Sequence, residues 1–327
     1  MSQRLGIKDI KRKIIMAKLG YIQVTRQCNQ QCIICSNPPN EEILTLRKAQ
    51  QKIDEIKEEG GEGVIITGGE PTLYTDLPAL IGYAYKKGVF PRIITNGQKM
   101  ADFTYAESLK NAGLRHLHLS IYSYQNKIQS IISKNKDSLK NVIKALDNLG
   151  KIKVITVNIN ITISKLNANH LSKTVEWLIE KYPFVEHFVF NNLDPFMNRA
   201  SENSQKVVPR LHDFELELYR ALKILAEKGK TFRVERVPLC YLPQFEFSST
   251  ETRKIVKKEA RTVYFLDQKG KSTQAEWKSE KTKCCTYCSL DDICAGVYGW
   301  GRGYSVSELS PVFVDKGEII KKIKDEK

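Results

Sequence analysis

Three cysteines lie close together near the start of the chain. Cys28, Cys32 and Cys35 occur in the stretch TRQCNQQCIICSNPP (25–39), separated by gaps of three and then two residues. Thiolates at such short spacing are soft ligands for zinc or for an iron–sulfur cluster. No fourth cysteine follows nearby. The triplet therefore predicts either a zinc site completed by a distant residue, or a [4Fe–4S] cluster whose fourth iron is open to a small molecule.

Small and polar residues follow the next predicted strands. TGGEP (67–71) overlaps the end of the apolar run GVIIT (63–67), and TNG (95–97) follows the third predicted strand. Ser120 ends the fourth strand and Asn160 lies in the fifth. Because the carboxyl ends of parallel barrel strands meet at one face, we expect these groups and the cysteines to converge on one cavity.

Predicted strands and helices alternate over roughly 200 residues. Strands are expected over 19–25, 63–67, 91–95, 115–121, 153–163 and 185–191, with helices over 46–56, 76–87, 102–112, 139–149 and 168–181. This alternation implies an α/β fold with a parallel sheet and crossover helices. Six units are too few for a closed eight-stranded barrel, so the sequence predicts a partial (β/α)6 TIM-type barrel.

The order of the two motifs adds a family resemblance. C-x3-C-x2-C after a first strand, followed by G-G-E-P after a second, resembles the radical S-adenosylmethionine (SAM) enzymes over roughly residues 19–236. The resemblance implies that Cys28, Cys32 and Cys35 ligate a [4Fe–4S] cluster and that SAM chelates the fourth iron. It further implies that one electron cleaves SAM to methionine and a 5′-deoxyadenosyl radical, which abstracts a hydrogen atom from the substrate.

The same resemblance assigns the SAM contacts. Gly68, Gly69 and Glu70 would receive the methionyl ammonium, and Glu70 is also a catalytic candidate. Ile34 stands where the family often has an aromatic residue near the adenine, so an aliphatic side chain would pack there. The remaining candidates for carboxylate and ribose contacts are Thr95, Asn96, Ser120 and Asn160. The alternative is structural: an ordinary turn at the glycines, and Glu70 as a helix N-terminal acid.

A second group of cysteines lies near the C-terminus. KCCTYCSLDDICAG (283–296) contains Cys285, Cys288 and Cys294 at the spacing C-x2-C-x5-C, and Cys240 precedes it in VPLCYLP. Four such thiolates suit a second iron–sulfur cluster or a zinc ion. The region resembles the twitch domain, a shortened SPASM-type auxiliary-cluster domain found in many radical SAM enzymes. We expect a second [4Fe–4S] cluster here, with zinc as the alternative.

This region contains a fifth cysteine, Cys284, which is one more than the four ligands that a cluster or a zinc ion needs. Either Cys284 or Cys285 could be the fourth ligand, because they are adjacent. A free Cys284 would be an inert buried thiol, or it would act catalytically by donating a hydrogen atom to a substrate radical, as a peptide epimerase requires.

Composition and the chain ends set further bounds. The net charge is +15, which suggests an acidic partner, although the scattered lysines favour solvated surfaces. No apolar run approaches the roughly 18 residues of a membrane span, and eight cysteines suggest metal ligands, so we expect a cytoplasmic protein. We expect a basic helix over 1–18, the barrel over 19–236 and the auxiliary domain over 237–327, ending in a solvated helix.

Two classes of function follow. The first is a radical SAM enzyme that modifies a peptide by crosslinking, epimerisation or oxidation, or that acts on a small or phosphorylated metabolite such as a sugar, nucleotide or cofactor precursor. The N-terminal segment is expected to be too short for a winged peptide-binding domain, which favours the smaller substrate. The second class is a non-catalytic, metal-stabilised RNA-binding protein, but a binder has no use for an open iron. The expected partners are the substrate and a low-potential electron donor such as flavodoxin or ferredoxin, with no nucleic acid or membrane.

Overall fold

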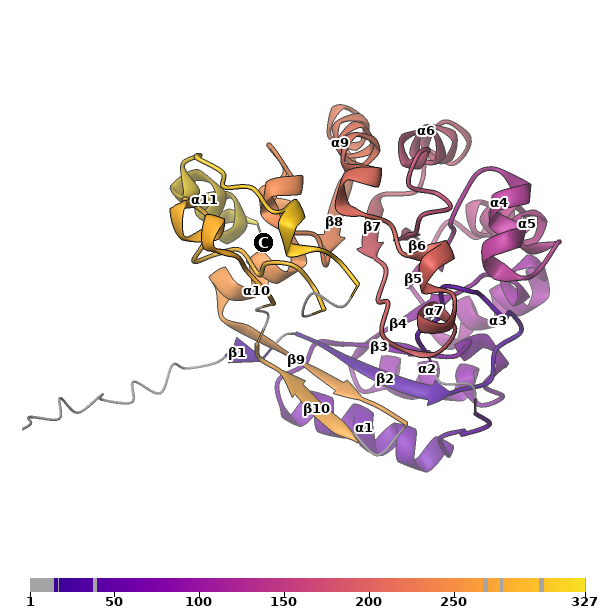
Figure 1. The fold of residues 1–327 in the computed structure, drawn as a ribbon. Coiled ribbons are helices and arrows are strands. Elements are labelled where there is room, and N and C mark those ends of the chain that lie inside the picture. Colours follow the sequence, from indigo (N-terminus) through magenta and orange to yellow (C-terminus); the bar gives the residue numbers. More distant parts are fainter. Residues whose placement is uncertain are drawn as a thin grey trace, which may run out of the picture.

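The fold is an open, partial barrel of parallel strands. Figure 1 shows the computed structural model, which describes residues 15–16, 18–37, 40–266, 270–276, 279–299 and 303–326. The barrel strands pair in chain order and in parallel; they are β2 (Leu19–Thr25), β3 (Gly63–Gly68), β4 (Phe90–Thr95), β5 (His116–Ser120), β6 (Thr156–Ile163), β7 (His187–Asn192) and β8 (Thr231–Glu235). The predicted fold class is confirmed. The parallel series continues past the sixth predicted strand to β8, which pairs with β7.

Helices cover the outer face of this sheet (Figure 1). They are α1 (Leu46–Glu58), α2 (Leu77–Lys86), α3 (Phe103–Ala112), α4 (Asn126–Ser133), α5 (Ser138–Ile152), α6 (Leu171–Lys181) and α9 (Leu211–Glu227). Each presents an apolar stripe to the strands: α1, for example, buries Ala49, Ile53 and Ile56. The sequence pattern predicted five of these helices but missed α4 and α9.

The two faces of the barrel strands differ in chemistry. On β6, Val157, Ile159 and Ile161 are fully buried and belong to the main hydrophobic core under the helices. Because side chains alternate along a strand, the intervening Asn158 and Asn160 face the barrel interior. The sheet therefore carries an apolar outer face and a polar inner one, which is what positions polar groups around an internal site.

The sheet also continues beyond β2 with strands from the C-terminal region. β9 (Glu259–Tyr264) pairs in parallel with β2, and β10 (Lys271–Gln274) pairs with β9 in antiparallel orientation. The sheet thus crosses residue 236, where we predicted a domain boundary. β1 (Ile15–Met16) pairs with the other edge of β9, so the predicted helix is wrong at these two positions; residues 1–14 and 17 lie outside the described residues.

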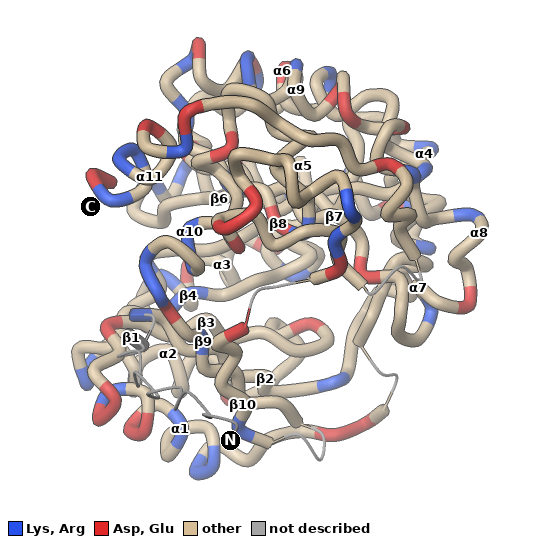
Figure 2. The backbone as a smooth tube through the Cα atoms, turned by 60° about the vertical axis from the view of Figure 1, so that its left-hand side comes forward, with Lys and Arg blue, Asp and Glu red and all other residues tan. Residues whose placement is uncertain are grey.

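The remaining helices and turns are short. The α-helices are α7 (Asn198–Glu202), α8 (Ser204–Val207), α10 (Thr250–Lys257) and α11 (Lys316–Asp325). The 3-10 turns are η1 (Pro71–Leu73), η2 (Lys99–Ala101), η3 (Leu239–Tyr241), η4 (Glu246–Ser248), η5 (Lys283–Tyr287) and η6 (Val306–Glu308). Among the described residues, no helix is both long and apolar enough to cross a membrane. Figure 2 shows basic and acidic residues interspersed over the chain, as expected from the scattered lysines.

The C-terminal helix is packed rather than solvated. Ile319 and Ile323 of α11 are buried against α10 and η4. The carboxylate of Glu326, just after α11, forms ion pairs of 2.7 Å with Arg233 and 2.6 Å with Arg253. The prediction of a solvated tail is therefore wrong, because the sequence pattern KGEIIKKIKDEK did not reveal that a partner surface covers its isoleucine face.

We predict that Ile323→Ala lowers the free energy of unfolding by about 2–4 kcal/mol, because it removes a fully buried side chain between α11 and its neighbours. Lys321→Ala, on the exposed face of the same helix, should change it by less than about 0.5 kcal/mol. Chemical denaturation followed by circular dichroism measures both. Equal effects of the two substitutions would show that α11 does not pack as described.

Candidate active site and auxiliary cysteine site

The three N-terminal cysteines meet in the loop that follows β2. Cys28 is exposed, Cys32 is buried and Cys35 is intermediate. Burial, and to a smaller extent the neighbouring thiols of Cys35 and Cys28, raises the pKa of Cys32 to about 12. Although part of the Cys28 residue is exposed, neighbouring atoms desolvate its thiol and raise its pKa, with Glu70 and then Cys35 contributing. The thiols are thus close enough to influence one another, and a bound cation would stabilise their thiolate forms.

Three groups of α7 donate hydrogen bonds to backbone carbonyls of this loop. The carbonyl of Cys32 accepts a hydrogen bond of 3.0 Å from Nε of Arg199, and the carbonyl of Cys35 accepts one of 3.2 Å from the backbone N–H of Ala200. The Asn198 side-chain amide donates to the carbonyl of Ser36 at 2.6 Å. The loop is therefore fixed by its backbone, which leaves the cysteine sulfurs available as ligands.

A small hydrophobic cluster, separate from the main core, supports the same loop. Ile33 and Ile34 pack with Ile132 of α4 and with Leu193, Ala200 and Val207. Ile34 is only 6% exposed. The contact with adenine remains a prediction, because most of the Ile34 side chain packs against other residues of this cluster.

The two glycines of TGGEP are required by a close approach of two chain segments. Gly68 has φ +146°, and a Cβ on it would lie 2.1 Å from the carbonyl oxygen of Thr25. A Cβ on Gly69 would lie 2.3 Å from the carbonyl oxygen of Gln27. The backbone N–H groups of Gly69 and Glu70 donate to these carbonyls, at 2.6 Å to Thr25 and 2.8 Å to Gln27. The end of β3 thus pins the start of the cysteine loop.

Glu70 is a buried carboxylate that accepts four hydrogen bonds. Oε1 accepts from the N–H of Thr72 and from the hydroxyls of Thr72 and Thr95, at 3.1, 2.6 and 2.6 Å. Oε2 accepts from the N–H of Asn96 at 2.7 Å. Burial raises the pKa of Glu70, and the hydrogen bonds from Asn96, Thr72 and Thr95 oppose that shift. Glu70 caps the N-terminus of η1, as the structural interpretation of this residue expected. Its contact with the SAM ammonium remains a prediction.

Asn96 connects this network to the cysteines. Its side-chain amide donates to Oδ1 of Asn29 at 2.7 Å and lies 3.8 Å from the sulfur of Cys28. The strand ends of β3 and β4 and the cysteine loop therefore form one connected site, with Glu70 at its centre. The convergence expected from the parallel strands is present for TGGEP, TNG and the triplet.

Ser120 and Asn160 lie side by side on the next two strands, in register with each other on β5 and β6. Burial and Arg92 lower the pKa of His118 to about 4, and a hydrogen bond with the Asn160 side chain opposes that shift. Asn160 therefore already has a partner on the neighbouring strand β5. The position is compatible with the predicted cofactor contact, which stays a prediction.

A cavity of about 1000 Å³ lies inside the barrel next to the cysteine loop. Its lining includes Ser36 and Asn37 of that loop and Thr67 of TGGEP, and it extends to β8, β9 and β10. The charged lining residues are Arg26, Arg236, Arg261, Asp194, Glu235, Glu251 and Glu276. Tyr298 and Gly299 also line it. The volume lies at the upper end of the range for small-ligand sites.

Sequence analysis missed the charged wall of this cavity. Arg236 has φ +60°, donates its backbone N–H to Glu251 at 3.0 Å and places its guanidinium 5.1 Å from the ring centre of Tyr298. Burial and the charge of Glu235 raise the pKa of Glu251 to about 7. The sequence did contain a signal for this wall, because Arg233 and Glu235 alternate with apolar residues on β8. Polar residues at every second position of a buried strand indicate that one face of the sheet is polar.

The C-terminal cysteines also lie close to one another. Burial raises the pKa of Cys240 to about 12, with the thiols of Cys294 and Cys285 adding to the shift. Burial also raises the pKa of Cys294, with a smaller contribution from Cys288. The four predicted auxiliary ligands therefore interact as one group. We call Cys240, Cys285, Cys288 and Cys294 the auxiliary cysteines.

Neither cysteine group is arranged around a single ion. Among the residues that the structure describes, no three His, Cys, Asp or Glu side chains are close enough to ligate one metal ion. A [4Fe–4S] cluster binds each thiolate through a different iron, so its ligands are further apart than those of one ion.

Cys284 lies at the edge of the auxiliary cysteines. Its sulfur is 2.9 Å from the hydroxyl of Thr282 and 3.5 Å from the carbonyl oxygen of Leu309. Burial, with a contribution from the adjacent Cys284, raises the pKa of Cys285. Cys284 is not among the described residues that line the large cavity. Its catalytic role and the choice between Cys284 and Cys285 as a ligand remain predictions.

Comparison with known proteins places residues 22–178 in a family model described as "Radical SAM superfamily". The chain is 33% identical to the GTP 3′,8-cyclase of Campylobacter jejuni (strain RM1221) over 178 residues, which are 50% of this chain and 53% of that protein. It is 26% identical to an S-adenosylmethionine-dependent nucleotide dehydratase of Selenomonas ruminantium over 243 residues, 66% of this chain and 85% of that protein. The chain thus spans about half the length of the first relative.

A solved structure resembles the chain over nearly its whole length. Streptococcus suis SuiB bound to the precursor peptide SuiA has a TM-score of 0.67 and 17% identity, and the match covers 93% of this chain and 76% of that one. At this identity the likeness shows the fold alone. The fold is therefore shared with a peptide-bound protein, whereas the sequence matches include proteins named for nucleotide chemistry.

We predict that Gly69→Ala displaces the cysteine loop, because its Cβ would overlap the carbonyl oxygens of Gln27 and Arg26 at 2.3 and 2.4 Å. The variant should lose about 1–3 kcal/mol of stability and most of its reconstituted iron at the N-terminal site. Iron analysis after anaerobic reconstitution measures this loss. Gly82→Ala is the matched control, since its Cβ would meet only the Ala112 carbonyl at 3.5 Å. Full iron retention in Gly69→Ala would show that the contact between the end of β3 and residues 25–27 does not hold the cysteine loop in place.

We also predict a pH dependence from Glu251. Its pKa is about 7 in the folded protein, above the ordinary value of 4.5, so the folded state holds the proton more tightly than the unfolded state. The contribution of Glu251 to stability should therefore be full below pH about 4.5 and be lost as the pH rises through about 7, by on the order of 1–3 kcal/mol. Glu251→Gln should remove this part of the slope in unfolding curves measured at several pH values. Identical slopes in the two proteins would refute the assignment.

Proposed function

We propose that this chain, whose residues 22–178 match a family model described as "Radical SAM superfamily", is a radical SAM enzyme that abstracts a hydrogen atom from a substrate held in the barrel cavity. One observation carries the proposal: three mutually interacting thiols, the TGGEP turn and a cavity of about 1000 Å³ meet at the same end of the barrel. An iron–sulfur cluster bound there would lie beside the space where a substrate fits.

The chain's own residues have separate tasks in this proposal. Cys28, Cys32 and Cys35 would hold a [4Fe–4S] cluster, which together with SAM would supply a carbon radical strong enough to break an unactivated C–H bond. Gly68, Gly69 and Glu70 position the cysteine loop and the SAM ammonium. Other SAM contacts are proposed for Ile34, Thr95, Asn96, Ser120 and Asn160, of which Ser120 and Asn160 lie in register on β5 and β6.

A second [4Fe–4S] cluster is proposed at the auxiliary cysteines. Their mutual pKa effects support one shared ligand group, and four thiolates suffice to close a cube without an exposed iron. Residues 237–327 would then form a twitch-like region attached to a barrel over 19–236. A redox cofactor would have a use beside a radical site, whereas zinc has no redox chemistry to offer.

A peptide segment is the substrate that the cavity lining favours. Four carboxylates, from Asp194, Glu235, Glu251 and Glu276, face three guanidinium groups. Because the pKa of Glu251 is about 7, the acidic and basic groups of this wall nearly balance in charge, and such a wall suits a neutral or zwitterionic ligand better than a highly anionic one. The outcome would be crosslinking, epimerisation or oxidation of that peptide, with electrons from a low-potential donor such as flavodoxin or ferredoxin.

A small phosphorylated metabolite is the second candidate. The sequence matches to a GTP 3′,8-cyclase and a nucleotide dehydratase favour it, and Arg26, Arg236 and Arg261 would provide anion contacts. Incubating the anaerobically reduced enzyme with peptide pools and with nucleotides, followed by mass spectrometry of the products, separates the two candidates.

We expect the triple variant Cys28→Ala, Cys32→Ala, Cys35→Ala to lose reductive SAM cleavage while keeping the fold, because the loop packs in its own small hydrophobic cluster. Production of 5′-deoxyadenosine under anaerobic reduction measures the loss, and circular dichroism checks the fold. The unaltered protein should bind about eight irons and eight sulfides, and the triple variant about four of each. Continued formation of 5′-deoxyadenosine by the triple variant would refute the proposed function.

A further inference from the structure

Segment 309–312 runs between the auxiliary cysteines. The N–H of Val312 donates to the sulfur of Cys288 at 3.3 Å, and the backbone of Ser310 donates a hydrogen bond to the Cys240 thiol. The carbonyl of Leu309 accepts from Cys284 at 3.5 Å. Pro311, between the two donors, has no N–H to give, so the amides that can reach sulfur are those at 310 and 312.

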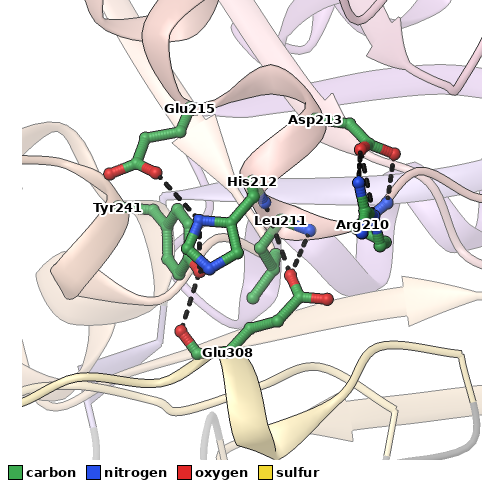
Figure 3. Close-up of polar contacts among 7 residues, drawn as sticks. All are labelled: Arg210, Leu211, His212, Asp213, Glu215, Tyr241 and Glu308. Carbon is green, nitrogen blue, oxygen red and sulfur yellow. Dashed lines mark hydrogen bonds and ion pairs between the residues drawn. The ribbon is translucent and has the colours of Figure 1, made fainter.

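Glu308, directly before this segment, is bonded to a barrel helix. Figure 3 shows its carboxylate at the N-terminus of α9, where Oε2 accepts from the backbone N–H groups of Leu211 at 2.6 Å and His212 at 3.4 Å. These N–H groups lack partners within the helix, and the helix dipole favours a negative charge there. A side chain from the C-terminal region thereby supplies the cap.

A second contact fixes the backbone of the same residue. The hydroxyl of Tyr241, next to Cys240 in the chain, donates to the carbonyl oxygen of Glu308 at 2.7 Å and lies 3.1 Å from Nε2 of His212 (Figure 3). The anchor itself is firm, because Phe214 and Leu218 of α9 are fully buried in the main core. Glu308 is therefore held through both its side chain and its main chain.

We propose that Glu308 is a positioning residue for the auxiliary site: it anchors segment 309–312 to α9, so that the amides of Ser310 and Val312 point at the thiols of Cys240 and Cys288. N–H···S hydrogen bonds stabilise thiolates and tune the metal group that they hold. The inference rests on the proposed auxiliary cluster for its consequence, and on the contacts above for its geometry.

The test uses iron release in the background of the triple variant at Cys28, Cys32 and Cys35, where the auxiliary cysteines are the remaining cluster ligands. Adding Glu308→Ala should speed release of iron to a chelator by about 10-fold or more, as expected for loss of an outer-shell contact. Glu308→Gln keeps an oxygen acceptor for the α9 amides and should stay within about threefold of the parent.

Asp213→Ala is the matched control. Asp213 caps the same end of α9 by accepting from the N–H of Arg210 at 2.9 Å, and Figure 3 shows that it is directed away from Glu308. It should destabilise the helix without moving segment 309–312, and release iron at the parental rate. Equal release from Glu308→Ala and Asp213→Ala would overturn the proposal, because Glu308 would then act only as a helix cap.

A second measurement keeps the inference separate from the proposed cluster. In the metal-free full-length chain, Glu308→Ala should raise the rate at which iodoacetamide alkylates Cys240 and Cys288 by about 10-fold relative to Asp213→Ala, because a released segment 309–312 exposes both sulfurs to the reagent by more than the lost N–H···S bonds reduce their thiolate fraction. Mass spectrometry of the digested protein locates the modified thiols. If the triple variant binds no iron, the auxiliary cluster is refuted, and the alkylation rates still decide whether Glu308 positions the segment; unchanged rates would overturn it.

Discussion

The site depends on a backbone-to-backbone contact between the end of β3 and the first residues after β2. Gly69 donates to the Thr25 carbonyl at 2.6 Å, and any side chain at 68 or 69 would overlap the carbonyls of residues 25–27. This contact fixes where the cysteine loop begins. Glu70 then ties the same turn to Asn96 on the neighbouring strand, and Asn96 reaches Cys28. Displacing one of these groups would therefore displace the others.

The C-terminal region is attached to the barrel at three places, which explains how it can share a cavity with the cysteine loop. β9 extends the sheet beside β2, Glu308 caps α9, and Glu326 pairs with Arg233 of β8. Residues from β9, β10 and the loop at Tyr298 then close one wall of the cavity. Substrate binding and the auxiliary cysteines would thus be coupled through the frame of the barrel.

The sequence was informative wherever local pattern decides structure. Alternation of apolar runs predicted the barrel strands, and the spacing of Cys28, Cys32 and Cys35 predicted one group of thiols. Long-range pairing was not visible: EARTVY (259–264) has no signal that it joins β2, and the isoleucines of α11 looked solvated until their partner surface was known. The glycines of TGGEP were expected to admit a ligand, which stays a prediction, and the structure shows in addition that they admit another part of the chain. Charges on the cavity wall were missed because they come from six separate places in the chain.

The central claim is that Cys28, Cys32 and Cys35 hold a cluster with one iron left for SAM. Electron–nuclear double resonance on the reduced protein, with SAM carrying ¹⁵N in its amino group, tests it directly. The account predicts that the label changes the hyperfine coupling seen at the cluster, because the amino nitrogen would bind the fourth iron. Identical spectra with labelled and unlabelled SAM would contradict the claim.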